Sequence, residues 1–257
     1  MFKVFMTCPV IIQELIYKKF DILIFFLIKY KMNIKEAKDI LDYWFPKDGS
    51  PDYDKWFLKS QVYDDEIKEK FGYLLKQAEA GLGFGWLHTK ESFIAYIILL
   101  DQFSRHIYRG TSDSFKNDNG ALIFAELGFE IYRKELIGYE FMFAFMPYMH
   151  TENLKFQRNG TQIFNLQLKM YGVKEKEKYV YRPITNPETI AKMTSFVPTR
   201  YDKEYEMLKS MRPHVEGHFK TLFKYGRFPK RNESLGREST ESELKYMALP
   251  EVQKRPY

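Results

Sequence analysis

The chain has 257 residues, a net charge of +6 and a sequence pI of about 9.0, with 45% hydrophobic and 18% aromatic residues. This length suits one large domain or two small ones, and the aromatic content excludes a disordered chain. A single cysteine excludes an intramolecular disulfide and a cysteine-based zinc site. The composition and the single cysteine predict a globular protein of a reducing compartment, which we expect to be the cytoplasm. Because acidic and basic residues are interleaved, we expect no specific nucleic-acid partner.

Residues 1–31 form an extension ahead of the single helical domain that we expect over 32–257. Charged residues precede the apolar run over 22–28, whereas a membrane-spanning helix needs about 20 mostly apolar residues. We therefore expect no membrane span, and no small-residue cleavage site follows the run to indicate a signal peptide. The extension is interpreted as a helix packed on the domain or as an upstream translation artefact. A chain that begins at Met32 is expected to be soluble and helical, with a cooperative melt.

From Met32 onward, apolar residues recur at helical spacing and no alternating strand pattern of useful length occurs, so the predicted class is all-α. Thr240 with Glu243 has the pattern of a capping box, and Gly81 follows a helix where a left-handed residue is expected. Pro213 is expected to kink or restart its helix. The expected helical segments are 34–44, 67–78, 93–103, 121–132, 139–146, 154–171, one starting at 186–188, 201–223 and 241–249.

The most apolar helix, 93–103, is expected at the centre of the core, and the first group of candidate site residues lies at its polar end. Asp101 and Arg105 are spaced four apart and can pair along one helix face, with Gln102 beside them. The group is interpreted as a structural ion pair, since polar groups on a buried helix must find partners, or as part of a ligand site. The side chains expected to be largely buried are Trp44, Trp56, Phe93, Ile97, Leu100 and Phe103.

His150 lies at a predicted helix junction, next to Thr151 and Glu152. It could serve as a general base held by Glu152, or the two side chains could bind a metal ion. Alternatively, Thr151 caps the following helix and Glu152 lies at the positive end of the helix dipole. That interpretation leaves His150 without a structural role.

A second pair of histidines, His214 and His218, has the spacing of one helix face. The zinc-protease pattern requires a glutamate directly after the first histidine, whereas Glu216 lies two positions on. We therefore interpret His218 as a buried, hydrogen-bonded core histidine, and we expect no metal and no cofactor.

The loop 224–232 concentrates positive charge, including Arg227 and Arg231. Arginine forks suit carboxylates and phosphates, so the loop could form an anion site. Alternatively, its arginines bind the carbonyl groups at helix C-termini. The chain has no phosphate-binding loop, nucleophile elbow or dinucleotide fingerprint.

Several motifs run in a fixed order, at 40–45, 55–57, 99–110 (LLDQFSRHIYRG), 146–152 (MPYMHTE), 226–232 (GRFPKRN) and 235–240 (LGREST). Together they resemble domain-of-unknown-function family 924, which is mostly bacterial, over about residues 33–250. The resemblance implies one all-helical domain with a tetratricopeptide-like superhelical arrangement and no established activity. Ser104, His106 and Lys230 depart from the residues common in the family. The recurring polar positions form the candidate pocket: Asp101, Gln102, Arg105, His150, Glu152, His218, Arg227, Arg231 and Asn232.

Two functions are compatible with these features. The first is a binding or scaffold module whose polar pocket takes a small anionic ligand or a protein partner. The alternative is a hydrolase-like enzyme that uses His150 with Asp101 or Glu152 while arginines hold an anionic substrate. Convergence of the candidate residues in one concave pocket favours a ligand or catalytic site. We expect the loop 227–232 to fold back near the 101–105 helix end and His150.

Overall fold

The computed structural model describes residues 34–81, 83–170 and 202–253, and within these ranges it contains helices and no strand. This confirms the predicted all-α class for the described part of the chain. Residues 1–31 and the expected helix start at 186–188 lie outside the described residues. The elements are α2 (Ile34–Trp44), α3 (Tyr53–Phe57), α4 (Gln61–Glu79), η1 (Phe84–Leu87), α5 (Lys90–Ile97), η2 (Ile98–Phe103), α6 (Ser104–Ile107), η3 (Ser112–Phe115), α7 (Asp118–Tyr132), α8 (Gly138–His150), α9 (Leu154–Met170), α11 (Asp202–Tyr225), η4 (Pro229–Arg231), α12 (Glu241–Met247) and α13 (Pro250–Gln253).

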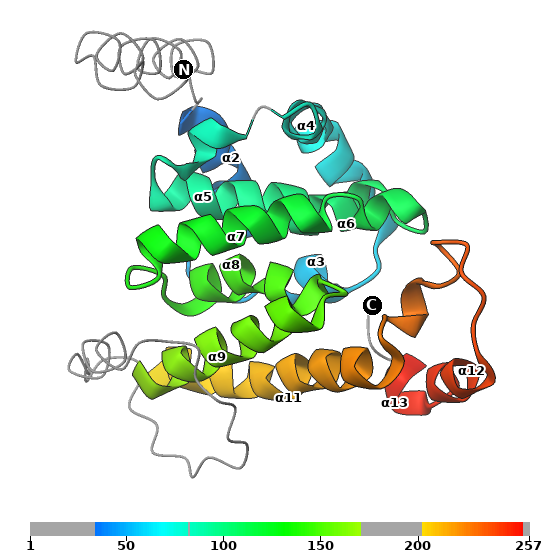
Figure 1. The fold of residues 1–257 in the computed structure, drawn as a ribbon. Helices are drawn as coiled ribbons and strands as arrows, with labels where there is room; N and C mark the ends of the chain where they lie inside the picture. The colour runs from blue at the N-terminus through cyan, green and yellow to red at the C-terminus, as the bar shows by residue number, and fades with distance from the viewer. Residues whose placement is uncertain (1–33, 82, 171–201, 254–257) are drawn as a thin grey trace, which may run out of the picture.

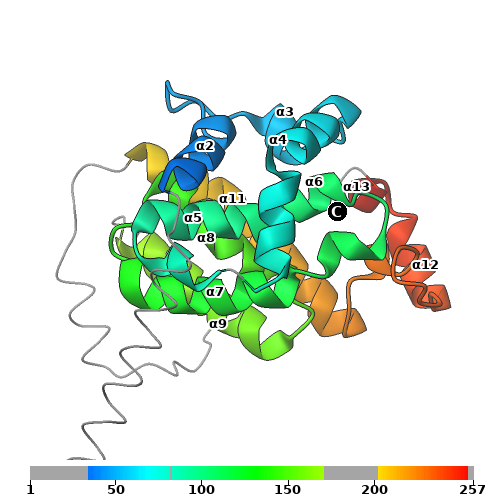
Figure 2. The same ribbon diagram turned by 90° about the horizontal axis from the view of Figure 1, so that it is seen from above.

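The helices pack largely in sequence order and form successive layers (Figure 1). The first helices cover one side of the central helix, α2 on α5 and α4 on α6, and α7 covers another side of α5. From there α7 packs on α8, and α8 packs on α9 and α11. Helices α12 and α13 lie at the end of the molecule where α6 lies, as Figure 2 also shows. The C-terminal helices and the polar end of the central helix therefore share one end of the fold.

The predicted helix ends follow local chemistry. The Thr240 hydroxyl accepts a hydrogen bond from the Glu243 amide at 3.3 Å, and the Glu243 carboxylate accepts one from the Thr240 amide at 2.8 Å, which confirms the capping box. Gly81 has a φ of +85°, the left-handed conformation expected after α4. The predicted restart at Pro213 is wrong, because α11 continues through this residue. A proline removes one backbone donor, and a helix of 24 residues keeps most of its other bonds.

The central helix is continuous over 90–107, but its middle six residues, Ile98–Phe103, are π-helical. The apolar periodicity predicted an ordinary α-helix here. A π-helical turn holds more residues than an α-helical turn, and such turns are frequent at functional sites. Asp101 and Gln102 lie within this turn and are both buried. The wide turn therefore carries a carboxylate and an amide into the protein interior.

Aromatic side chains dominate the core around this helix. Trp44 contacts Phe103 and Phe143 edge to face, and the Trp56 indole donates a hydrogen bond to the Trp44 carbonyl at 3.0 Å. A Cβ atom at Gly128 of α7 would lie 2.1 Å from the Phe93 ring, so glycine permits the close approach of α7 to α5. All six side chains predicted to be buried are at most 4% exposed, which confirms this part of the sequence analysis.

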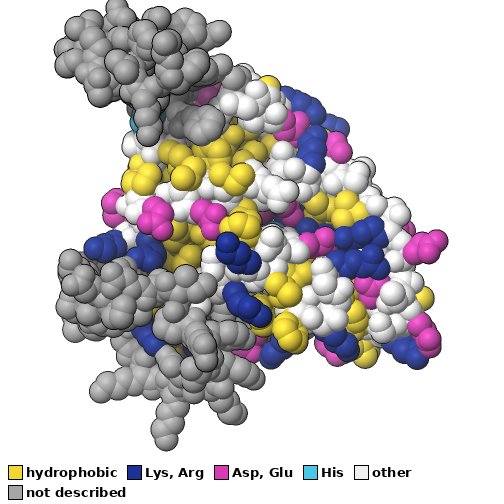
Figure 3. Space-filling model, viewed as in Figure 1, with side chains coloured by type: hydrophobic (Ala, Val, Ile, Leu, Met, Phe, Trp, Pro, Cys, Tyr) yellow, Lys and Arg dark blue, Asp and Glu magenta, His cyan; other side chains and the backbone are white. Residues whose placement is uncertain are grey.

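The surface of the described residues carries mixed charge. On the face in Figure 3, acidic and basic side chains lie among one another, and hydrophobic side chains are exposed between them. Exposed apolar residues include Ile123, Leu127 and Ile131, which are spaced four apart on α7. Among the described helices, none is both long enough and apolar enough to span a membrane.

Candidate functional site

A buried pair of side chains, Asp101 and His150, joins the π-helical turn to the C-terminal end of α8. His150 Nδ1 lies 2.7 Å from Asp101 Oδ1 and 2.9 Å from Asp101 Oδ2. Burial acts to raise the pKa of Asp101, but Arg105 and His150 outweigh it and hold the pKa at about 2. Burial, together with Arg105, lowers the pKa of His150 below its usual value. The pair is therefore a carboxylate and a neutral imidazole whose Nδ1–H donates to the carboxylate.

Two arginines surround this pair, and one aspartate bridges them. Arg105 Nη2 lies 2.9 Å from Asp118 Oδ1, and Arg231 Nη1 lies 2.9 Å from Asp118 Oδ2. Arg105 also lies 3.3 Å from the Asp101 carboxylate and donates to the Asp101 carbonyl. Arg231 Nη2 donates to the His150 carbonyl at 2.9 Å. These contacts bring the loop after α11 to the end of α8, so Arg231 converges with Asp101, Arg105 and His150 as expected.

Glu152 lies nearby but has a different set of partners. Its carboxylate accepts from the Phe228 amide at 2.7 Å and from Arg237 at 2.7 and 3.0 Å. Burial acts to raise the pKa of Glu152, and the bonds from Arg237 and the amide more than offset it, so the pKa is lowered. Glu152 thus binds the basic loop to the α8–α9 junction. The carboxylate that binds His150 is that of Asp101, and not that of Glu152. Thr151 is not the predicted cap: α9 begins at Leu154, and Asn153 accepts from the Lys155 amide at 3.0 Å.

The side chains of Arg227 and Asn232 bind partners other than Asp101 and His150. Glu243 accepts from Arg227 Nε at 2.7 Å and from Nη2 at 2.8 Å, and the Glu238 carbonyl accepts from Nη2 as well. The Asn232 amide donates to Ser239 Oγ at 3.0 Å. The expectation that Arg227 joins a shared pocket with His150 is therefore corrected. The reason is that Arg227 forms two hydrogen bonds with the buried capping-box carboxylate of Glu243 on α12.

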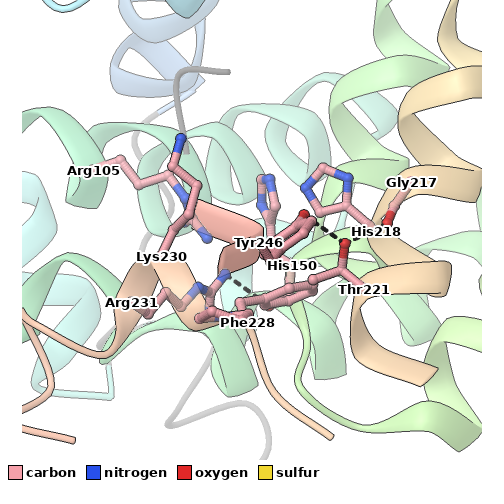
Figure 4. A pocket seen from close by; sticks show the side chains of 10 residues that line it. Arg105, His150, Gly217, His218, Thr221, Phe228, Lys230, Arg231 and Tyr246 are labelled. Atoms are coloured by element: carbon pink, nitrogen blue, oxygen red, sulfur yellow. Dashed lines mark hydrogen bonds between the residues drawn. The ribbon is translucent and has the colours of Figure 1, made fainter. Parts of the chain in front are cut away.

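A cavity lies between α8, α11, η4 and α12, and we call it the histidine cavity (Figure 4). Three cationic side chains lie on one side of the view, and the two histidines lie with Thr221 and Tyr246 on the other. Within the described part of the chain, no aspartate or glutamate lines it. The lining residues are Arg105, His150, Gly217, His218, Thr221, Phe228, Pro229, Lys230, Arg231 and Tyr246.

His218 lines this cavity and is half-buried, so it is not the core histidine that the sequence predicted. Its hydrogen bond is present, since His218 Nδ1 lies 2.8 Å from the His214 carbonyl. Desolvation, together with His150 and Arg231, lowers the pKa of His218. His214 is exposed and does not line the cavity that His218 lines. In the described ranges, no three His, Cys, Asp or Glu side chains are grouped to hold a metal ion.

A second cavity, of about 530 Å³, lies on the other side of Arg231 and shares His150 and Arg231 with the histidine cavity. The Arg231 guanidinium lies over the Phe115 ring at 4.4 Å and over the Phe228 ring at 4.9 Å, which fixes it between the two spaces. The second cavity also contacts Asp118 and Glu152, and it therefore has mixed charge. Gln102 lines neither cavity; its amide donates to Asp101 and to the Met146 sulfur.

Sequence reasoning missed several residues that build this region. In the sequence, Asp118 can be recognised only as an acidic residue in the first turn of a helix. Arg237 can be recognised only as part of the motif at 235–240. Glu243 was identified as a capping residue, although it also binds Arg227.

A separate buried group contains Asp64, His106 and Arg109. His106 Nδ1 lies 2.8 Å from Asp64 Oδ1, and Arg109 Nη2 lies 2.7 Å from the same oxygen. Burial lowers the pKa of His106 from 6.5 to about 4, and Arg109 acts in the same direction. Below pH 6.5 the unfolded chain therefore binds a proton that the folded chain does not bind.

This difference predicts acid sensitivity. As pH falls from 6.5 to 4, His106 alone is expected to remove about 3 kcal/mol of the free energy of unfolding. Urea unfolding of the protein and of His106→Asn across this range measures the effect, since the variant should lack this part of the loss. The exposed His88 provides a control, because His88→Asn should keep the full pH dependence. Equal pH dependence in the protein and in His106→Asn would contradict the prediction.

Comparison with known proteins places these observations in a family. Residues 40–251 match the family described as bacterial protein of unknown function (DUF924). The chain is similar to a solved structure, the protein of unknown function ATU0120 from Agrobacterium tumefaciens, with 26% identity and a TM-score of 0.59. The similarity covers 82% of this chain and 96% of that one. None of the curated proteins matches the chain. Because the family match spans most of the sequence, the protein belongs to the DUF924 family, as its motifs indicated.

Proposed function

We propose that the protein is a binding module that takes a small anionic ligand into the histidine cavity. The observation that carries the proposal is the lining: Arg105, Lys230 and Arg231 border the cavity, and no carboxylate of the described residues does. Arginine and lysine are the side chains that bind carboxylate and phosphate groups most strongly. The carboxylates that form ion pairs with the two arginines, Asp101 and Asp118, lie outside the lining.

The proposal is tested with inorganic phosphate and propionate as probes. ¹⁵N-labelled histidine signals should shift saturably on titration, because His150 and His218 line the cavity. Lys230→Ala should weaken binding about tenfold, the size expected for one charge-assisted hydrogen bond. Lys224→Ala is the matched control, since it removes the same charge from an exposed position on α11, and it should change binding less than about twofold. Absence of saturable shifts, or an equal loss in both variants, would overturn the proposal.

A second candidate function is a small-molecule hydrolase that acts on an anionic substrate. The Asp101–His150 pair favours it, since a carboxylate that holds the Nδ1–H of a neutral imidazole leaves Nε2 to act as a general base. In such a reaction Nε2 takes a proton from water while the water oxygen attacks the substrate carbonyl. The 4-nitrophenyl monoester of succinic acid is a suitable probe, because it releases a coloured phenolate.

If this function is correct, the protein should hydrolyse the probe, and His150→Gln should abolish the hydrolysis. The rate should be constant with pH above about 6.5, because the pKa of His150 is lowered below the usual value for histidine. A rate that is unaffected by His150→Gln would exclude His150 as the base.

We further propose that residues 32–257 act as one domain with a tetratricopeptide-like superhelical arrangement, in the cytoplasm. The order of packing, in which α7, α8 and α9 each contact the next helix, supports the superhelical arrangement. The single cysteine supports a reducing compartment.

A further inference from the structure

In each of the two imidazoles of the histidine cavity, the partner of Nδ1 determines which ring nitrogen donates a hydrogen bond and which accepts one. A backbone carbonyl and an ionised carboxylate can only accept hydrogen bonds, so His218 Nδ1 must donate to His214, and His150 Nδ1 must donate to Asp101. In a neutral ring, Nε2 then carries the lone pair. The two ring centroids are 6.1 Å apart, and neither Nε2 receives a hydrogen bond from the described residues. The cavity is therefore lined by two imidazole acceptors.

Tyr246 adds a third acceptor by the same reasoning. The Thr221 hydroxyl donates to the Gly217 carbonyl at 2.8 Å, and it lies 2.9 Å from the Tyr246 hydroxyl (Figure 4). Because threonine has only one hydroxyl hydrogen, the Tyr246 hydroxyl is the donor in the second bond. The phenol oxygen keeps its lone pairs for a ligand in the cavity that it lines.

We propose, resting on the function proposed above, that the ligand is a hydroxylated organic acid. Its anionic group would bind the side formed by Arg105, Lys230 and Arg231, and its hydroxyl groups would donate to the acceptors on the opposite side. The side chains that provide those acceptors are His150, His218 and Tyr246.

Two other ligand types are disfavoured by the same lining. Paired histidines whose Nδ1 atoms are held by acceptors also occur at metal sites. Here, however, three cationic side chains line the same cavity and repel a metal cation. An ammonium group meets the same repulsion, whereas a neutral hydroxyl group supplies a donor without a charge.

The experiment compares three probes that share one charge and one carbon skeleton: propionate, lactate and glycerate, which carry no, one and two hydroxyl groups. Binding is measured from the ¹⁵N imidazole shifts of His150 and His218. Each hydroxyl group should tighten binding about threefold to tenfold, the range for a single hydrogen bond to a neutral partner. His150 and His218 signals should remain those of neutral rings in the complex.

Tyr246→Phe tests the contribution of one acceptor. The side chain is half-buried on α12, and the variant keeps its ring. It should lower the ratio of glycerate to propionate affinity about threefold or more, because it weakens glycerate binding more than propionate binding. Tyr225→Phe is the matched control, because the Tyr225 ring packs on Tyr246 at 5.1 Å without lining the cavity. The control should keep the full ratio.

The outcomes separate this inference from the proposed function. Equal affinity for all three probes would overturn the inference and leave anion binding in place. A loss of propionate binding in Tyr246→Phe would also overturn it, since the residue would then act on the whole site. Absence of binding by every probe would overturn the proposed function and this inference together.

Discussion

Arg105→Ala is expected to lower the free energy of unfolding by about 3–5 kcal/mol, the cost of leaving buried charges without their partner. Arg105 is 2% exposed and contacts Asp101, which is fully buried, as well as Asp118. Without the guanidinium, both carboxylates stay in a medium that solvates them poorly. Urea unfolding at pH 7 measures the loss.

Further variants show whether the loss comes from charge. Arg105→Lys should recover part of the stability, because it restores the charge without the fork that reaches both carboxylates. Adding Asp101→Asn to Arg105→Ala should also recover part of it, since Asp101 is fully buried and loses its ion pair with Arg105. Arg158→Ala on α9 is the control, as Arg158 is exposed, and it should change stability by less than about 0.5 kcal/mol. A loss below about 1 kcal/mol in Arg105→Ala would show that water reaches the carboxylates.

Leu100→Ala is expected to cost about 2–5 kcal/mol, through lost burial and the cavity left behind. Leu100 lies in the π-helical turn and is 4% exposed, between the buried residues Leu99 and Asp101. Neighbouring side chains can relax only partly around this turn, because helices α4, α7 and α8 pack against it. The variant therefore also tests whether the turn is part of the rigid core.

Urea unfolding of Leu100→Ala is compared with Leu244→Ala on α12, where the side chain is 55% exposed. The control should change stability by less than about 0.5 kcal/mol. A cost below about 1 kcal/mol at Leu100 would mean that the central helix is peripheral to stability. The slope of the free energy with urea should be the same in both variants, since neither changes the surface exposed on unfolding by much.

Most of the helices and the core could be predicted from the sequence, since these features depend on residues within one or two helical turns. Thr240 and Glu243 are three residues apart, and their capping box formed as predicted. Gly81 adopted the left-handed conformation because only the local backbone decides it. The family was also visible in the order of the motifs.

The candidate site could be predicted only in part. Asp101, Arg105 and His150 converge, and Arg231 joins them across 113 residues of sequence through Asp118. The bridging role of Asp118 could not be predicted from its position at a helix start, because it depends on which arginines the tertiary fold brings to it.

The sequence by itself determined that this protein is all-α over the described residues, how the helix end at Gly81 and the helix start at Thr240 are capped, and which apolar side chains form the core. Only the tertiary structure decided that Arg227 binds Glu243 while Arg231 reaches His150, and that the central helix widens into a π-turn at Asp101. The physical reason is how far apart along the chain the interacting residues lie. Periodicity and capping involve neighbours along one helix, whereas ion pairs and cavities form between elements whose relative positions depend on the packing of the whole core.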